Sequence, residues 1–192
     1  SFSIGGSVSQ NNLLQTDLRR DTSLRLKFIN YFPRANLNLT MKKNRNLGVY
    51  YNGSTQQPTI DQLQPIADNN DPLNISIGNP DLQVAVNHRL GINMGAYDFL
   101  SESGYWASIN GSVTQHGFST RDFIDSLGRR IFQTVNVNGI YNFNGYFDYN
   151  FKLKKTGFNF NTGLNFGYGQ NVNFVNGEEN KVTNGSLGLR AS

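Results

Sequence analysis

The 192-residue sequence contains no cysteine, only two histidines and no long apolar run. Without cysteine, the chain has no disulfide framework, no thiolate metal site and no cysteine nucleophile. No window approaches the roughly 18 consecutive apolar residues that indicate a membrane-spanning helix. Charged residues make up only 16% of the chain and the net charge is +4, which disfavours a disordered polyelectrolyte and a strongly basic nucleic-acid-binding protein. We therefore expect no nucleic acid among its partners.

The polarity of the chain comes from uncharged residues. The sequence has 28 asparagines and 20 glycines beside 14 phenylalanines and 9 tyrosines. Asparagine and glycine are poor helix formers, whereas aromatic residues favour strands. The composition therefore predicts an all-β protein.

Apolar and polar residues alternate along much of the chain, which places one set of side chains on each face of a strand. Between residues 35 and 42 every odd position is apolar and every even position is polar. The longest run, residues 135–153, predicts one continuous strand. Similar runs occupy residues 2–8, 47–51, 84–94, 105–114, 158–168 and 187–191. We therefore expect about eight strands.

The expected connections alternate between short and long. Tight turns are predicted at residues 43–46, 98–103 and 154–157, and longer loops at residues 10–23, 56–82, 117–130 and 174–183. In an antiparallel up-and-down meander, all tight turns then lie at one rim and all long loops at the other. This asymmetry is typical of a transmembrane outer-membrane β-barrel.

The two faces of such strands would meet different surroundings. In a barrel the apolar row faces lipid, and the Asn, Ser, Thr and Gly row lines a wet interior. In the alternative, a soluble β-sheet binding module, the apolar row would build a core and the polar row would carry more charge than it does here. Aromatic residues near the turns would supply an interfacial girdle; these are Phe99, Tyr105, Trp106, Phe151 and Phe158.

Several short motifs follow one another in a fixed order between residues 31 and 100. Tyr31-Phe32-Pro33 comes first, and Gly78-Asn79-Pro80-Asp81-Leu82 is the most distinctive. With these motifs, about a third of the chain resembles the outer-membrane barrel region of TonB-dependent receptor-like proteins of Gram-negative bacteria. The motif residues of loop 56–82 that carry the resemblance are Pro58, Gln62, Leu63, Pro65, Asp71, Pro72, Gly78, Asn79, Pro80 and Leu82.

The resemblance implies a receptor or transporter in the cell outer membrane, surrounded by lipid, that imports a nutrient such as a glycan, a peptide or a chelate. Family members carry a plug domain through which a TonB-type protein energises transport, and some work with a surface lipoprotein. We take residues 1–192 as a single barrel segment without a plug, internal to a larger barrel. A self-contained eight-strand barrel and a non-transporting barrel that anchors or displays partners remain alternatives.

The motif residues indicate loop architecture rather than chemistry. Proline removes a backbone donor and fixes φ, so Pro58, Pro65, Pro72 and Pro80 would stop strand pairing and shape the loop. This loop either folds over the rim as structure or shapes a mouth for a ligand or partner. His88 lies on an apolar row and His116 ends a strand, which are poor settings for a general base. We expect no enzymatic activity, no cofactor and no metal.

Overall fold

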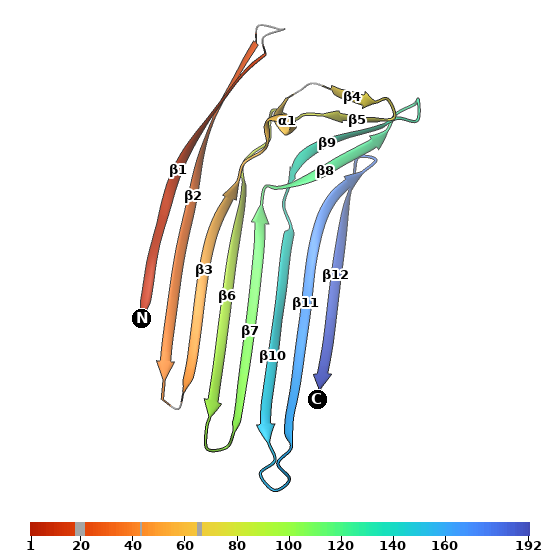
Figure 1. Ribbon diagram of the computed structural model, residues 1–192. Helices are drawn as coiled ribbons and strands as arrows, with labels where there is room; N and C mark the ends of the chain where they lie inside the picture. Colours follow the sequence, from red (N-terminus) through yellow and green to blue (C-terminus); the bar gives the residue numbers. More distant parts are fainter. Residues whose placement is uncertain (18–21, 43, 65–66) are drawn as a thin grey trace.

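The computed structural model describes residues 1–17, 22–42, 44–64 and 67–192, and most of them lie in one sheet. Eight long strands form an antiparallel up-and-down meander (Figure 1), which confirms the predicted fold. They are β1 (Phe2–Asp17), β2 (Thr22–Met41), β3 (Arg45–Gln56), β6 (Ala85–Asp98), β7 (Ser103–Gln115), β10 (Ile140–Lys152), β11 (Asn159–Val175) and β12 (Glu178–Ala191). Within the described residues, β1 and β12 form the two edges of this meander.

Shorter elements lie across one end of the meander (Figure 1). They are α1 (Ile60–Leu63), β4 (Ala67–Asp71), β5 (Asn74–Ile77), β8 (Gly117–Ile124) and β9 (Arg130–Val137). We call these elements and the segments that join them, residues 57–64, 67–84 and 116–139, the loop cap. β8 joins the loop cap to the meander through a parallel pair with β11, and within the cap β9 pairs antiparallel with β8 and parallel with β5. Segments 56–82 and 117–130, expected as longer loops, therefore contain a short helix and short strands.

Among the described residues, no helix has both the length and the apolar character needed to cross a bilayer.

The predicted long loop at residues 174–183 is wrong, because β11 and β12 are joined by a two-residue turn. Val175 pairs with Glu178, and the intervening Asn176 and Gly177 have φ of 51° and 85°. Positive φ at both central positions defines the hairpin turn for which Asn-Gly is the strongest sequence signal. The sequence therefore contained the evidence for this turn.

The predicted loop at residues 10–23 is wrong over residues 10–17 and 22–23, and residues 18–21 lie outside the described residues. The described residues continue the ladder of β1 and β2 as far as the pair Asp17 and Thr22. A ladder is built from backbone groups, so it can continue where the alternation of side chains has ended.

The predicted continuous strand 135–153 is interrupted at Asn138 and Gly139, where Gly139 has a φ of 87°. The chain leaves the loop cap here, as β9 ends and β10 enters the meander (Figure 1). His116, with a φ of 50°, marks the matching break between β7 and β8, and its backbone N–H donates to Asn138 Oδ1 at 2.9 Å. The sequence analysis predicted one strand here because apolar residues occupy most of the odd-numbered positions in both β9 and β10.

The three predicted tight turns are confirmed and lie together at the end opposite the loop cap (Figure 1); Lys43, in the first of them, lies outside the described residues. Two neighbouring turns are tied together, because Lys152 pairs with Glu102 at 2.6 Å and Lys154 Nζ donates to the Leu100 carbonyl at 2.6 Å. The strict alternation of short and long connections fails only at the opposite rim.

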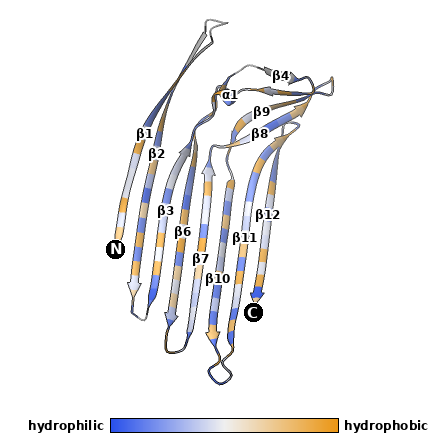
Figure 2. Cartoon of the chain, viewed as in Figure 1, coloured by the Kyte–Doolittle hydropathy of each residue, from blue (hydrophilic) through white to orange (hydrophobic). Residues whose placement is uncertain are grey.

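Cross-strand register confirms the assignment of the faces, and Figure 2 shows apolar and polar residues alternating along the strands. One row across the eight strands consists of Phe2, Leu37, Val49, Ile92, Ile109, Gly145, Phe166 and Leu187. The adjacent row on the other face includes Asn38, Gly48, Asn93, Ser108, Tyr146, Asn165 and Gly188. The meander therefore has one apolar face and one polar face.

In the described part of the chain, no second sheet or helix packs on the apolar face of the meander. Large apolar side chains stay exposed there, including Phe143 at 43% and Leu189 at 81%. The buried apolar residues lie instead in the loop cap and beside it; they are Leu63, Leu82, Ala85, Val135, Val137 and Val172. This arrangement disagrees with the soluble alternative, in which the apolar row would form the core.

Candidate functional site

The motif residues at the start of loop 56–82 build a short capped helix. Thr59 is the N-cap of α1, and its side chain accepts from the Gln62 backbone N–H at 3.4 Å. Gln62 Oε1 accepts in return from the Thr59 N–H at 2.9 Å, which completes a capping box. Pro58 is buried before the cap, and Leu63 is buried at its end with 1% exposure. The local sequence therefore sets where α1 begins and which side chain it buries.

The second group of motif residues joins α1 to β9. The Asn79 backbone N–H donates to the Gln62 carbonyl at 2.6 Å, and Asn79 Nδ2 donates to the Thr134 carbonyl at 3.0 Å. Gly78 is buried, and its carbonyl accepts from Gln133 Nε2 at 3.1 Å. Leu82 ends this segment with 5% exposure. Gln62, Leu63, Gly78, Asn79 and Leu82 thus meet in one place.

The remaining motif residues do not join this group. Asp71 and Pro72 form the exposed turn between β4 and β5, where Asp71 accepts from the Leu73 N–H at 2.9 Å and from Asn74 Nδ2 at 2.8 Å. These bonds, led by the one from the Asn74 side chain, hold the pKa of Asp71 below its usual value. Pro80 is exposed, and Pro65 lies outside the described residues. The motif therefore serves the architecture of the loop cap.

Asparagines that the sequence analysis did not single out complete the loop cap. Asn136 Oδ1 accepts from the Gln83 N–H at 2.7 Å, while its Nδ2 donates to the carbonyls of Gln83 at 3.0 Å and His116 at 2.6 Å. Asn136 therefore clamps two chain segments that are distant from it in sequence. Alternation placed Asn136 on a polar row, and no local signal distinguishes a clamping amide from a solvated one.

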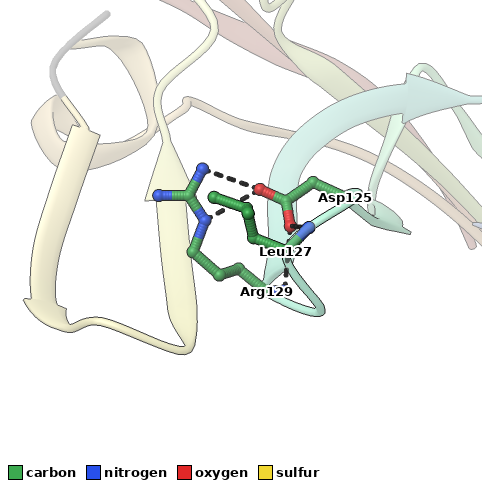
Figure 3. A network of polar contacts seen from close by, with 3 residues as sticks. All are labelled: Asp125, Leu127 and Arg129. Atoms are coloured by element: carbon green, nitrogen blue, oxygen red, sulfur yellow. Dashed lines mark hydrogen bonds and ion pairs between the residues drawn. The ribbon is translucent and has the colours of Figure 1, made fainter.

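The turn between β8 and β9 is held by one carboxylate (Figure 3). Asp125 accepts from the backbone N–H groups of Leu127 and Arg129, each at 2.9 Å, and pairs with the Arg129 guanidinium at 2.7 Å. The backbone and side-chain bonds from Arg129 lower the pKa of Asp125. This turn carries Leu127 to the tip of the loop cap, where the residue is 73% exposed.

Uncharged groups form a network on the polar face. Tyr50 donates its hydroxyl to Asn110 Oδ1, Asn110 Nδ2 donates to Ser108 Oγ at 3.0 Å, and Ser108 Oγ donates to Asn93 Oδ1 at 2.6 Å. The ring of Tyr50 lies over Gly91, its cross-strand partner. Amides and hydroxyls can both donate and accept, which lets these partly buried groups bond to one another. Because these groups are uncharged, they give the polar face hydrogen-bonding capacity without a strong electrostatic potential.

Tyr105 and Phe151 of the expected aromatic girdle lie on the apolar face, whereas Phe99 and Phe158 lie in the tight-turn segments outside the strands. Tyr105 pairs with Tyr149 across the strands near the tight turns, and the rings of Phe151 and Phe160 stack at 5.5 Å. Trp106 lies on the polar face, the side that alternation along residues 105–114 gives it, because it pairs with Gly95 and Asp148. The side chains of Trp106 and Tyr105 therefore lie on opposite faces of the meander.

The two histidines take the positions that their sequence contexts indicated. His88 lies on the apolar face, where its Nδ1 is 2.8 Å from the Tyr51 hydroxyl. His116 is exposed at the break before β8. Within the residues that the structure describes, no cluster of three His, Asp or Glu side chains could hold a metal ion.

Comparison with known proteins shows which family the chain belongs to. No curated protein and no solved structure matches the chain. The family described as the outer membrane protein beta-barrel family matches residues 2–192, which is nearly the whole sequence. An exposed apolar face, a polar face opposite and tight turns at one rim agree with that match. The chain belongs to the outer membrane protein beta-barrel family.

Proposed function

We propose that the intact protein imports a nutrient across the outer membrane and that this chain forms part of the barrel wall. As a member of its family, the chain lies in the outer membrane. The observation that supports the proposal is the continuity of its two faces, because apolar and polar rows each cross all eight strands of the meander. In this proposal the apolar face meets lipid and the polar face borders the passage.

The proposed nutrient is a glycan, a peptide or a chelate, and the proposed energy source is a TonB-type protein acting through a plug domain. This part of the proposal rests on the resemblance carried by the motif residues. Gln62, Gly78 and Asn79 bond to one another or to β9, which orders the loop cap at the rim opposite the tight turns. A surface lipoprotein would meet the protein at this rim.

The proposed role is non-enzymatic and uses no cofactor, metal or nucleic acid. The side chain of His88 is engaged with Tyr51 on the apolar face, away from the polar rows. His116 lies between the end of β7 and the start of β8, where its backbone N–H donates to Asn138 Oδ1. Neither setting favours proton transfer to a substrate in the passage.

Uptake by living cells tests the import proposal. Cells lacking the intact protein would be compared with complemented cells for uptake of labelled oligosaccharides, peptides and metal chelates. We expect one nutrient class to be lost without the protein, and lost equally when the TonB-type protein is removed. Unchanged uptake of all three classes would contradict import.

A second candidate function is the anchoring or display of a partner without transport. Three apolar residues at the outer end of the loop cap favour it, because Leu73, Ile124 and Leu127 are 63%, 65% and 73% exposed. Leu73 and Ile124 are neighbours through Arg130, which donates its backbone N–H to the Leu73 carbonyl and pairs with Ile124 in the ladder. Loss of a surface protein from cells lacking this barrel, with uptake unchanged, would support display over import.

A further inference from the structure

The polar face contains a hollow of about 450 Å³ near the tight turns. It is built from two adjacent cross-strand rows. One row supplies Asn38, Gly48, Asn93 and Tyr146 to the lining, and the next supplies Thr40, Asn46, Gly95 and Trp106. The volume lies in the range of pockets that hold small ligands.

Glycines keep the floor of this hollow open. Gly48 and Gly95 occupy central positions in the two rows, where any other residue would project a side chain from the polar face. A Cβ at Gly95 would lie 3.0 Å from the Trp106 ring and 3.1 Å from Asn46 Oδ1. The indole and an amide therefore stand directly beside the space that the glycine leaves.

Aromatic rings border the hollow and remain accessible. Trp106 is 44% exposed and Tyr146 is 48% exposed, although both lie on the polar face. On the lipid-facing side of a barrel, exposed rings need no further explanation. On a wet face they expose apolar area to water, which a ligand with an apolar surface of its own would cover.

Leu39, Leu47, Met94 and Ala107 also line the hollow, and the remaining lining side chains are neutral and polar. Asn38, Asn46 and Asn93 are exposed, so their amides can both donate and accept hydrogen bonds. No residue that lines the hollow is charged. The neighbouring carboxylate, Asp148, is engaged by Arg190 at 2.6 Å. The hollow therefore offers aromatic surface and amides but no counter-charge.

We propose that this hollow binds a neutral carbohydrate, with Trp106 and Tyr146 against the apolar face of a sugar ring and the amides of Asn38, Asn46 and Asn93 on its hydroxyls. A sugar hydroxyl both donates and accepts, which suits an amide better than a charged group. A charged peptide or a charged chelate would find no ionic partner in the lining. The inference rests on the proposed import function and narrows its nutrient to neutral glycans.

Calorimetric titration of the intact protein in detergent tests the inference. The probes are three neutral hexasaccharides, maltohexaose, cellohexaose and laminarihexaose, with hexagalacturonate as the charged comparison. We expect at least one neutral hexasaccharide to bind and hexagalacturonate to bind about tenfold more weakly or not at all. Failure of all three neutral probes, or equal binding of hexagalacturonate, would overturn the proposal.

A matched pair of variants places the binding on the polar face. Tyr146 and Tyr149 are both tyrosines of β10 with exposures of 48% and 37%, but they lie on opposite faces. We expect Tyr146→Ala and Trp106→Ala each to weaken binding about tenfold, the scale of one lost aromatic contact, and Tyr149→Ala to leave it unchanged. Equal weakening by Tyr146→Ala and Tyr149→Ala would place the sugar elsewhere and overturn the assignment. Retained heat-modifiable migration in gels shows that each variant is folded.

The test of sugar binding and the test of import can fail independently, because binding in detergent requires neither an energy source nor transport. Uptake of a peptide or chelate without hexasaccharide binding would remove the sugar inference and leave the import proposal standing. Hexasaccharide binding without uptake of any nutrient would remove import and leave the binding site.

Discussion

A side-chain carbon at Gly78 would overlap the carbonyl oxygen of Gln64. This close approach brings the end of loop 56–82 against the end of α1, where Asn79 N–H donates to the Gln62 carbonyl at 2.6 Å. Glycine is needed at position 78 because only a residue without Cβ leaves room for the passing backbone. The first residue of the motif at residues 78–82 is therefore a glycine because the backbone of Gln64 packs against it.

Gly78→Ala should loosen the loop cap at a cost of about 1–3 kcal/mol, because backbone atoms must move to admit the methyl group. Limited proteolysis of the intact protein in detergent measures the effect, and we expect faster cleavage between residues 57 and 84. Gly185→Ala is the control, since the nearest atom to its Cβ, Tyr168 Cδ2, is 3.7 Å away. Cleavage that is equally slow in both variants would show that the contact is not tight.

Arginine on the two faces of β11 should have opposite consequences. Leu164 pairs with Leu189 on the apolar face, whereas Asn161 pairs with Asn150 on the polar face. Arginine facing the middle of a bilayer costs about 2–4 kcal/mol in membrane barrels. We therefore expect Leu164→Arg to impair membrane insertion far more than Asn161→Arg, measured as the heat-modifiable fraction in isolated outer membranes. Equal insertion of the two variants would contradict the assignment of the faces.

Tyr50→Phe should remove one hydrogen bond from the polar face and preserve the ring over Gly91. The Tyr50 hydroxyl donates to Asn110 Oδ1, and a bond of this kind contributes about 1 kcal/mol. Urea unfolding in lipid vesicles should show a loss of this size. Gly91→Ala should cost more, because its Cβ would overlap the Tyr50 ring. A smaller loss for Gly91→Ala than for Tyr50→Phe would show that the ring does not lie over the glycine.

Acid should loosen the turn between β8 and β9. The bonds from Arg129 lower the pKa of Asp125, so the ionised carboxylate favours the ordered turn. Its contribution is present above the ordinary carboxyl pKa and is lost as pH falls through the lowered value, over a window that begins near pH 3.8 and extends below it. A spin label at Ser126→Cys, placed in a chain with no other cysteine, should become more mobile across that window.

The matched control for this pH dependence is Asp125→Asn in the same labelled protein. An asparagine side chain does not ionise in this range, so the label should already be mobile at pH 7 and should change little on acidification. A pH response that survives Asp125→Asn would assign the transition to another group.

The sequence predicted the faces of the meander and missed the extent of several strands. Alternation identified the apolar rows correctly in β3, β6 and β7, because the direction of a side chain from a strand is a local property of the backbone. It failed at Asn138 and Gly139, where the same alternation spans two strands with different neighbours. The turn at Asn176 and Gly177 was predictable from its dipeptide, and the interpretation as a loop overlooked it.

The sequence by itself determined that this chain forms strands with one apolar and one polar face, because residue types and their spacing decide side-chain direction. Only the tertiary structure decided how the motif residues act. Asn79 lies 55 residues from Thr134, and Asn136 lies 53 residues from Gln83, yet each pair is hydrogen-bonded. Contacts between such distant residues depend on how the strands pair and bend, which no local pattern specifies. The hollow beside Gly95 and Trp106 likewise exists only because register aligns two rows from separate strands.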